Sequence, residues 1–276
     1  IREAVAIDRL RDLVNTPAED MGPAALESEI EALAKAHGAQ VKVTRRDELE
    51  TGYPMVHAVG RAAARHHAPR IMHLTWGSDS APVLAIVGKG VCFDSGGLDI
   101  KPAAGMRLMK KDMGGAAHAI ALAGLVMAAN LPVRLHLLVP AVENAIAGSA
   151  FRPGDVLASR KGLSVEIHNT DAEGRMVLAD CLAWTRDQIQ PDILIDHATL
   201  TGAAMVALGP HRTALYTADD ELASQYLAAS EAADERYWRM PLDDDLRPML
   251  DSFVADLKHV GGPHGEIGRA SGRERV

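Results

Sequence analysis

Acidic and basic side chains gather in three short stretches, and the densest is segment 169–175, Asn-Thr-Asp-Ala-Glu-Gly-Arg. Asp171 and Glu173 stand one residue apart there, and Arg175 follows. The apolar run before the segment favours a strand, and the helical spacing of apolar residues after it favours a helix. Ligands bind at such junctions in open α/β sheets. Acids at a helix start also suit the helix dipole, so an ordinary helix N-terminus accounts for this stretch alone equally well.

The other two stretches favour ligand binding. Lys89 and Asp94 lie in residues 87–102, Val-Gly-Lys-Gly-Val-Cys-Phe-Asp-Ser-Gly-Gly-Leu-Asp-Ile-Lys-Pro, and Asp112 lies in residues 110–117, Lys-Lys-Asp-Met-Gly-Gly-Ala-Ala. Carboxylates that converge on one crevice repel one another strongly unless cations lie between them. Two divalent metal ions are the simplest such cations. Oxygen ligands suit Mg or Mn, and Zn accepts them too.

Two other chemistries fit these residues poorly. The G-x-x-x-x-G-K-[ST] pattern of a phosphate loop is absent around Lys89. The segment 94–97 is similar to the nucleophile segment of chymotrypsin-like proteases, but Phe93 stands where their glycine belongs, and their fold is all-β. The chain has no G-x-S-x-G elbow either. A serine nucleophile is therefore disfavoured.

Strands that alternate with helices must position these side chains. We expect a mostly parallel central sheet covered by helices on both faces, an α/β fold, with a glycine-rich loop after the strand at 83–87. The predicted strands are 40–44, 70–74, 83–87, 133–139, 164–167 and 192–195. The predicted helices are 3–14, 23–38, 115–129, one that follows residue 175, a small-residue helix after 202, and surface helices at 219–233 and 244–255.

Composition narrows the class of protein. The 276 residues, 47% of them hydrophobic, can form a sizeable core in one or two domains. A net charge of −8 argues against general nucleic-acid affinity, which needs a basic surface. Cys92 and Cys181 lie in apolar runs, as buried reduced thiols of a cytosolic protein do. Neither a membrane span nor a signal peptide is predicted. Because the chain opens on Ile1 rather than Met, we expect a fragment.

Taken together, the three stretches resemble the leucyl aminopeptidase family, the two-metal cytosolic enzymes of the M17 type. Residues 196–202 resemble a further segment of that family, and the resemblance runs from about residue 8 to about 262. It implies a cytoplasmic aminopeptidase that removes leucine or another apolar residue from peptides with a free amino terminus. It also implies a homo-oligomer, typically a hexamer. We expect no membrane or nucleic-acid partner.

The resemblance implies a role for each metal ligand. Asp94 and Glu173 resemble the carboxylates that bridge both metal ions. Lys89 and Asp112 would complete the exchangeable ion, and Asp171 the tighter one. The ions are Mn or Zn, with Mg as a further possibility.

Catalytic and substrate-binding roles carry over in the same way. Lys101 resembles the electrophilic lysine over the scissile carbonyl. Arg175 resembles the arginine that holds a bicarbonate-like anion, which would serve as the general base. The resemblance also implies a pocket for the first side chain, whose expected residues are Met109, Asn169, Thr199, Gly202 and, through its backbone carbonyl, Leu200.

The two ends of the chain depart from the family pattern. Residues 1–262 correspond to the catalytic domain, with 1–15 a remnant of the interdomain helix and no counterpart of the family's N-terminal domain. Residues 263–276 lack apolar periodicity and look non-native or divergent. Two alternatives therefore stay open: a truncated, metal-binding but inactive remnant, and a DNA-binding regulatory relative, which would need a basic surface.

Overall fold

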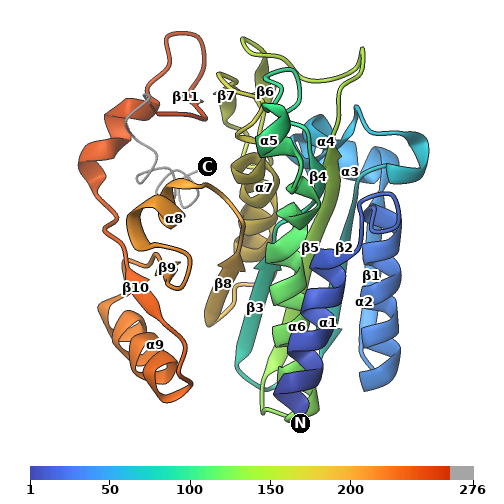
Figure 1. Cartoon of the computed structure of the whole chain (residues 1–276), viewed down its shortest axis with the longest axis vertical. Coiled ribbons are helices and arrows are strands. Elements are labelled where there is room, and N and C mark those ends of the chain that lie inside the picture. The colour runs from blue at the N-terminus through green and yellow to red at the C-terminus, as the bar shows by residue number, and fades with distance from the viewer. Residues whose placement is uncertain (262–276) are drawn as a thin grey trace.

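The computed structural model describes residues 1–261 and is built around a six-stranded sheet (Figure 1). The strands follow the order β1-β2-β5-β3-β8, and β4 pairs with the far end of β5. Pairing is parallel among β3, β4, β5 and β8 and antiparallel at β1 and β2. The predicted α/β fold is confirmed, with an antiparallel edge. The bounds are β1 Gln40–Arg45, β2 Arg70–Trp76, β3 Val83–Gly88, β4 Gly90–Asp94, β5 Arg134–Asn144 and β8 Ile193–His197.

Helices cover both faces of this sheet, as predicted. On one face α1 (Arg2–Asn15), α2 (Pro23–His37) and α6 (Gly114–Ala128) pack against one apolar cluster. On the other, α3 (Arg46–Gly52), α4 (Pro54–Gly60) and α7 (Glu173–Gln188) pack against a second. Because successive side chains of β5 point to opposite faces, this strand feeds both clusters. Its continuous apolar sequence follows from burial on both sides.

Smaller elements surround the two cores. Strands β6, β7 and β11 form a three-stranded sheet, and β9 pairs with β10. The bounds are β6 Val156–Ala158, β7 Ser164–Glu166, β9 Thr213–Leu215, β10 Tyr237–Arg239 and β11 Leu257–Lys258. The short helices are α5 Ala103–Met106 and α8 Ala203–Leu208, followed by α9 Asp220–Ala232. The 3-10 helices are η1 Arg65–His67, η2 Met109–Met113 and η3 Asp244–Leu250.

Three predictions about elements need correction. The strand predicted at 164–167 is β7, which pairs with β6 and β11 instead of joining the central sheet. The predicted glycine-rich loop after β3 contains β4, which pairs with β5. The helix predicted at 244–255 is the short η3, because Pro248 within it has no N–H to donate to a continuing helix.

The sequence predicts buried, reduced cysteines and no membrane span. Cys92 and Cys181 are free and buried, and they lie in the apolar clusters on opposite faces of the sheet. Across residues 1–261, no helix has both the length and the apolar character that a membrane crossing demands. The predicted non-native tail at 263–276 lies outside the described residues and stays a prediction.

Candidate functional site

Three buried carboxylates meet where β3 and β4 end. Asp94 is the last residue of β4, Glu173 is the first residue of α7, and Asp112 lies in η2. Each offers a carboxylate oxygen, and these oxygens all lie within 4.8 Å of one another. Chain segments far apart in sequence therefore converge on one small, acidic volume, as the sequence predicts for these three residues.

Lys89 enters this volume directly after β3 and is only 2% exposed. Its Nζ lies 2.6 Å from Asp112 Oδ2 and 3.0 Å from Glu173 Oε1. Burial lowers the pKa of Lys89, but the two carboxylates outweigh burial and raise its pKa above the ordinary value. A Cβ at Gly174 would lie 2.5 Å from Lys89 Cε, so the lysine passes over a position that has no room for a side chain.

Lys101 forms a second pair of contacts beside the first. Its Nζ lies 2.8 Å from Asp94 Oδ2 and 2.5 Å from Asp171 Oδ1. Burial again works against the charged form, yet hydrogen bonds to Asp171 and Asp94 raise the pKa of Lys101. Asp171 thus joins the cluster through Lys101. We call the set Lys89, Asp94, Lys101, Asp112, Asp171 and Glu173 the carboxylate cluster.

The carboxylate cluster brings four carboxyl groups together with two lysine ammonium groups. Burial, with Asp94 and Asp112 adding to it, raises the pKa of Glu173 to about 8. Burial and Asp94 also raise the pKa of Asp171. For Asp112, Lys89 and Lys111 outweigh burial and lower the pKa. Divalent cations would stabilise the charged form of these crowded, buried carboxyl groups, so the residues present pass this chemical test for a metal centre.

Asn144, at the end of β5, links the two loops that carry the acids. Its Nδ2 donates to Asp94 Oδ1 at 2.8 Å and to the Thr170 carbonyl at 3.1 Å. Asn144 is 1% exposed and lies opposite Asp94 in the β4–β5 pairing. No role was predicted for Asn144 from the sequence. Its position as a polar residue closing an apolar strand was the available signal.

Thr170 fastens the same loops from the other side. Its Oγ1 donates to the Gly96 carbonyl at 2.6 Å and accepts from the Asp99 N–H at 2.8 Å. The Thr170 N–H donates in turn to Asp99 Oδ2 at 2.7 Å. Thr170 and Asp99 both lie within the sequence motifs, but the motifs did not predict this link. Together with Asn144, they fix the relative positions of Asp94 and Asp171.

Arg175 lies two residues after Glu173, and its Nη1 donates to the His259 carbonyl at 2.8 Å. His259 Nε2 lies 2.8 Å from the Asn169 carbonyl, and the His168 N–H donates to His259 Nδ1 at 3.2 Å. Burial lowers the pKa of His259 to about 4, and Arg175 adds to this, so the ring is neutral near pH 7. His259 thereby joins the distant end of the described chain to this loop, and no sequence motif indicated it.

Three of the five residues predicted to bind substrate lie beside the carboxylate cluster. Thr199 Oγ1 donates to Asp112 Oδ1 at 2.7 Å, and a Cβ at Gly174 would meet Leu200 Cδ1 at 3.1 Å. Asn169 Oδ1 accepts from the Asp171 N–H at 2.8 Å. The remaining two are Met109, the half-buried first residue of η2, and Gly202, the exposed N-cap of α8.

Comparison of the sequence with known proteins identifies a family. The profile of the cytosol aminopeptidase family, catalytic domain, matches residues 8–272. A probable cytosol aminopeptidase from Rhizobium meliloti is 45% identical over 261 residues, which cover 92% of this chain and 51% of that protein. One from Chlorobium limicola is 43% identical over 259 residues, 91% of this chain and 50% of that protein. The chain spans about half the length of the curated relatives it matches.

Solved structures are similar over nearly the whole chain. The cytosol aminopeptidase of Coxiella burnetii has 50% identity and a TM-score of 0.95, covering 99% of this chain and 60% of that one. The bottromycin maturation enzyme BotP, solved in complex with Mn, has 41% identity and a TM-score of 0.93, again covering 99% and 60%.

Proposed function

The chain belongs to the cytosol aminopeptidase family, and on that premise we propose that it is a metal-dependent exopeptidase. It would hydrolyse the bond after the N-terminal residue of a peptide, preferably leucine or another apolar residue. The observation that carries this proposal is the buried set Asp94, Asp112 and Glu173, whose oxygens lie within 4.8 Å of one another, close enough for Asp94 and Asp112 to raise the pKa of Glu173.

Two divalent ions, Mn or Zn with Mg as a further possibility, would be held by five side chains. Asp94 and Glu173 would contribute to both ions, Lys89 and Asp112 to one, and Asp171 to the other. When bound, such ions lower the pKa of a coordinated water toward about 7 and polarise a carbonyl group. The Mn complex of the related BotP supports this choice of metal for the family.

The chain's own residues would orient the substrate and stabilise charge. Lys101 now neutralises Asp94 and Asp171, and its side chain is 15% exposed, so it borders the accessible side of the cluster. We propose that Lys101 donates to the oxygen of the scissile carbonyl as negative charge develops there. Arg175 would bind a bicarbonate-like anion through its guanidinium fork.

Lys89 would act as a ligand only after losing a proton. Its pKa is raised by Asp112 and Glu173, so a metal ion must displace that proton. Metal affinity should therefore fall as the pH falls. Glu173, with a pKa of about 8, is the acid of the cluster most easily protonated and strengthens this dependence.

Substrate, partners and location follow from the same proposal. Met109, Asn169, Thr199, Leu200 and Gly202 would surround the first side chain of the peptide. The chain would form a homo-oligomer, which the family resemblance implies is a hexamer. It would be cytoplasmic, in keeping with the relatives' name, cytosol aminopeptidase. The domain assignment, with 1–262 as the catalytic domain, stays part of it.

Hydrolysis of leucine p-nitroanilide by the purified chain tests the proposal. The protein is stripped of metal, refilled with Mn or Zn, and assayed alongside a count of bound ions. Metal-dependent turnover is the expected result. Two ions bound per chain without turnover would identify the inactive remnant instead. A chain that binds no metal and shows no turnover would lead us to reject the metal centre. A low-salt gel shift separately tests the DNA-binding alternative, which the net charge of −8 disfavours.

A further inference from the structure

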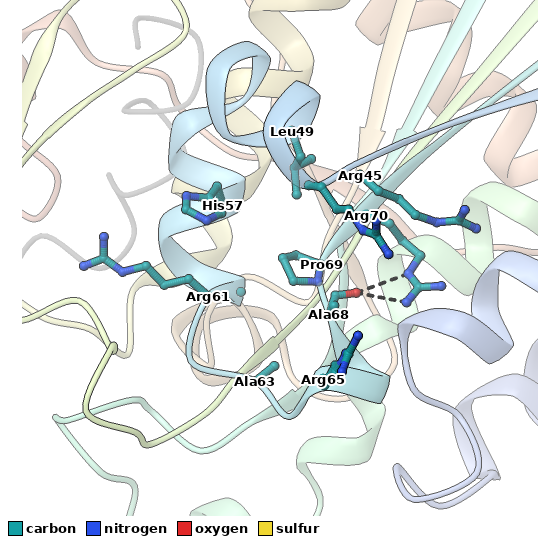
Figure 2. Close-up of a pocket in the computed structure, with 11 residues that line it drawn as sticks. Arg45, Leu49, His57, Arg61, Ala63, Arg65, Ala68, Pro69 and Arg70 are labelled. Atoms are coloured by element: carbon teal, nitrogen blue, oxygen red, sulfur yellow. Dashed lines mark hydrogen bonds between the residues drawn. The ribbon is translucent and has the colours of Figure 1, made fainter.

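A second concentration of charge, opposite in sign, lines a pocket of about 520 Å³ beside α3 and α4 (Figure 2). It shares no residue with the carboxylate cluster. Among residues 1–261, no acidic residue lines it, although the chain as a whole is acidic. Its volume falls within the range of small-molecule sites. We call it the arginine pocket; its charged lining residues are Arg45, Arg46, Arg61, Arg65 and Arg70, with His57.

Three of the arginines already have partners. Arg45 and Arg70 both pair with Glu27, the latter at 2.7 Å, and they hold the pKa of that carboxyl below its usual value although burial opposes the shift. Arg61 Nε donates to the Ser149 carbonyl at 2.7 Å, and its Nη2 lies 4.0 Å from Asp155 Oδ2, which balances its charge. In Figure 2 its side chain extends away from the other labelled arginines. One carboxylate between two guanidiniums leaves one positive charge uncompensated.

Arg46 and Arg65 add two more positive charges. Within residues 1–261, neither side chain makes a hydrogen bond or an ion pair with the protein. Figure 2 shows Arg65 rising from η1 toward Ala68 and Arg70. The arginine pocket therefore presents about three net positive charges, two of them on guanidinium forks with all donors available.

Local backbone rules are broken at the same place. Arg45 is the N-cap of α3 and Arg46 its first residue, where the helix dipole disfavours cations. Arg46 also has φ 52, a left-handed conformation that a residue with a side chain seldom adopts. Violations of this kind concentrate at functional sites, because elsewhere nothing compensates for them.

We propose that the arginine pocket binds a small oligophosphate group, such as the diphosphate or triphosphate end of a metabolite. Planar guanidinium forks match the oxygens of phosphate, and several negative charges on neighbouring phosphoryl groups complement the net charge of the pocket. The ligand reaches a site separate from the carboxylate cluster, so binding does not depend on the proposed peptidase activity.

Titration calorimetry of the metal-loaded chain with pyrophosphate at low salt tests this proposal. One binding site per chain is expected outside the carboxylate cluster. Arg46→Gly and Arg65→Ala should each weaken binding by about tenfold or more, since each removes charge-assisted hydrogen bonds. Arg46→Gly should also unfold at an equal or higher temperature, because glycine accepts a positive φ without strain. Lost affinity with retained stability separates recognition from folding.

Three controls test whether binding is specific to the arginine pocket and to phosphate. Arg186→Ala, an exposed arginine of α7, should leave binding unchanged. Asp94→Ala should still bind pyrophosphate, because the arginine pocket is separate from the carboxylate cluster. Loss of binding in this variant would show that metal ions hold the pyrophosphate and would overturn the proposal. Unchanged affinity in both arginine-pocket variants would overturn it too. Citrate should bind at least tenfold more weakly than pyrophosphate. Equal affinity for citrate would show that the pocket does not select phosphate over carboxylate and would overturn the proposal.

Discussion

The carboxylate cluster and the arginine pocket both concentrate charged side chains, but they differ in burial and in pairing. In the cluster, Lys89 and Asp112 are each 2% exposed, and each charged group contacts an opposite charge. In the pocket, Arg46 and Arg65 are exposed and have no partner within the described residues. A buried charge needs partners and hydrogen bonds, whereas an exposed one is solvated by water. Substitutions should therefore have larger effects in the cluster than in the pocket.

The largest effect is expected for Asp94→Ala. This change removes the proposed bridging carboxylate and leaves the largely buried Lys101 with Asp171 as its remaining partner. Turnover of leucine p-nitroanilide should fall below detection, and elemental analysis should find fewer than two ions per chain. Asp187→Ala, an exposed acid on α7, is the matched control. Unchanged turnover of Asp94→Ala would reject the bridging assignment.

A smaller effect is expected for Lys101→Ala, which separates electrophilic from ligand roles within the cluster. Loss of one donor to the carbonyl oxygen should reduce kcat on the order of 10²–10³-fold. The metal content should stay at the parent level, because Lys101 contacts the acids without being a proposed ligand. Steady-state kinetics and metal analysis of the same sample check both points. Metal loss in this variant, but not in Lys161→Ala, would instead make Lys101 part of the metal site.

Asn144→Ala tests whether hydrogen bonds hold the acids in place. It removes the donors to Asp94 and to the Thr170 carbonyl, and leaving such buried acceptors unsatisfied costs about 1–3 kcal/mol. Metal affinity should fall by roughly 10–100-fold, the usual effect of losing a group that orients a ligand. Calorimetric metal titration and thermal unfolding measure the two effects, with Gln188→Ala as an exposed amide control. Reduced stability with parental metal affinity would make Asn144 purely structural.

The smallest effect concerns acid stability of the sheet, away from both charged regions. His73 Nε2 lies 2.9 Å from His136 Nδ1, and burial, with the other ring adding to it for His73, lowers the pKa of both to about 4 from 6.5. The unfolded chain therefore binds more protons between these values. The contribution of this pair, measured as the difference in unfolding temperature between the parent and His136→Gln, should be complete above about pH 6.5 and fall as the pH decreases toward 4.

Differential scanning calorimetry from pH 7.5 to 4.5 checks that dependence. His136→Gln should flatten the curve, because it removes one titrating ring. A difference between parent and His136→Gln that grows on acidification would contradict the assignment of neutral histidines. The same scans show whether loss of peptidase activity in acid comes from the carboxylate cluster or from the fold.

Sequence patterns predicted most of the fold because periodicity is local. The apolar run at 83–87 and the helical spacing after Glu173 each need only their own neighbours to be recognised. Pairing between strands is not local. Nothing near β7 says that it pairs with β6 and β11, and nothing near β4 says that Asp94 lies opposite Asn144.

The same distinction accounts for what was missed at the two sites. The acids and lysines of the carboxylate cluster lie in dense motifs, so their convergence could be predicted from the ends of strands. The Asn144 and His259 contacts span long stretches of sequence and emerge only from the assembled sheets. The arginine pocket forms from side chains scattered between residues 45 and 70, whose spacing follows no motif.

The contact between Arg175 and His259 can form only late in protein synthesis. The two residues are 84 positions apart, so at the usual 5–20 residues per second the ribosome needs roughly 4–17 s to add the second after the first. During that interval the nascent chain already contains all five proposed metal ligands, and β8 and Thr199, which contact β3 and Lys89, are added to it. Segment 169–175 still lacks the carbonyl that receives the Arg175 guanidinium. The proposed metal ligands are therefore all synthesised before the last of these contacts can form.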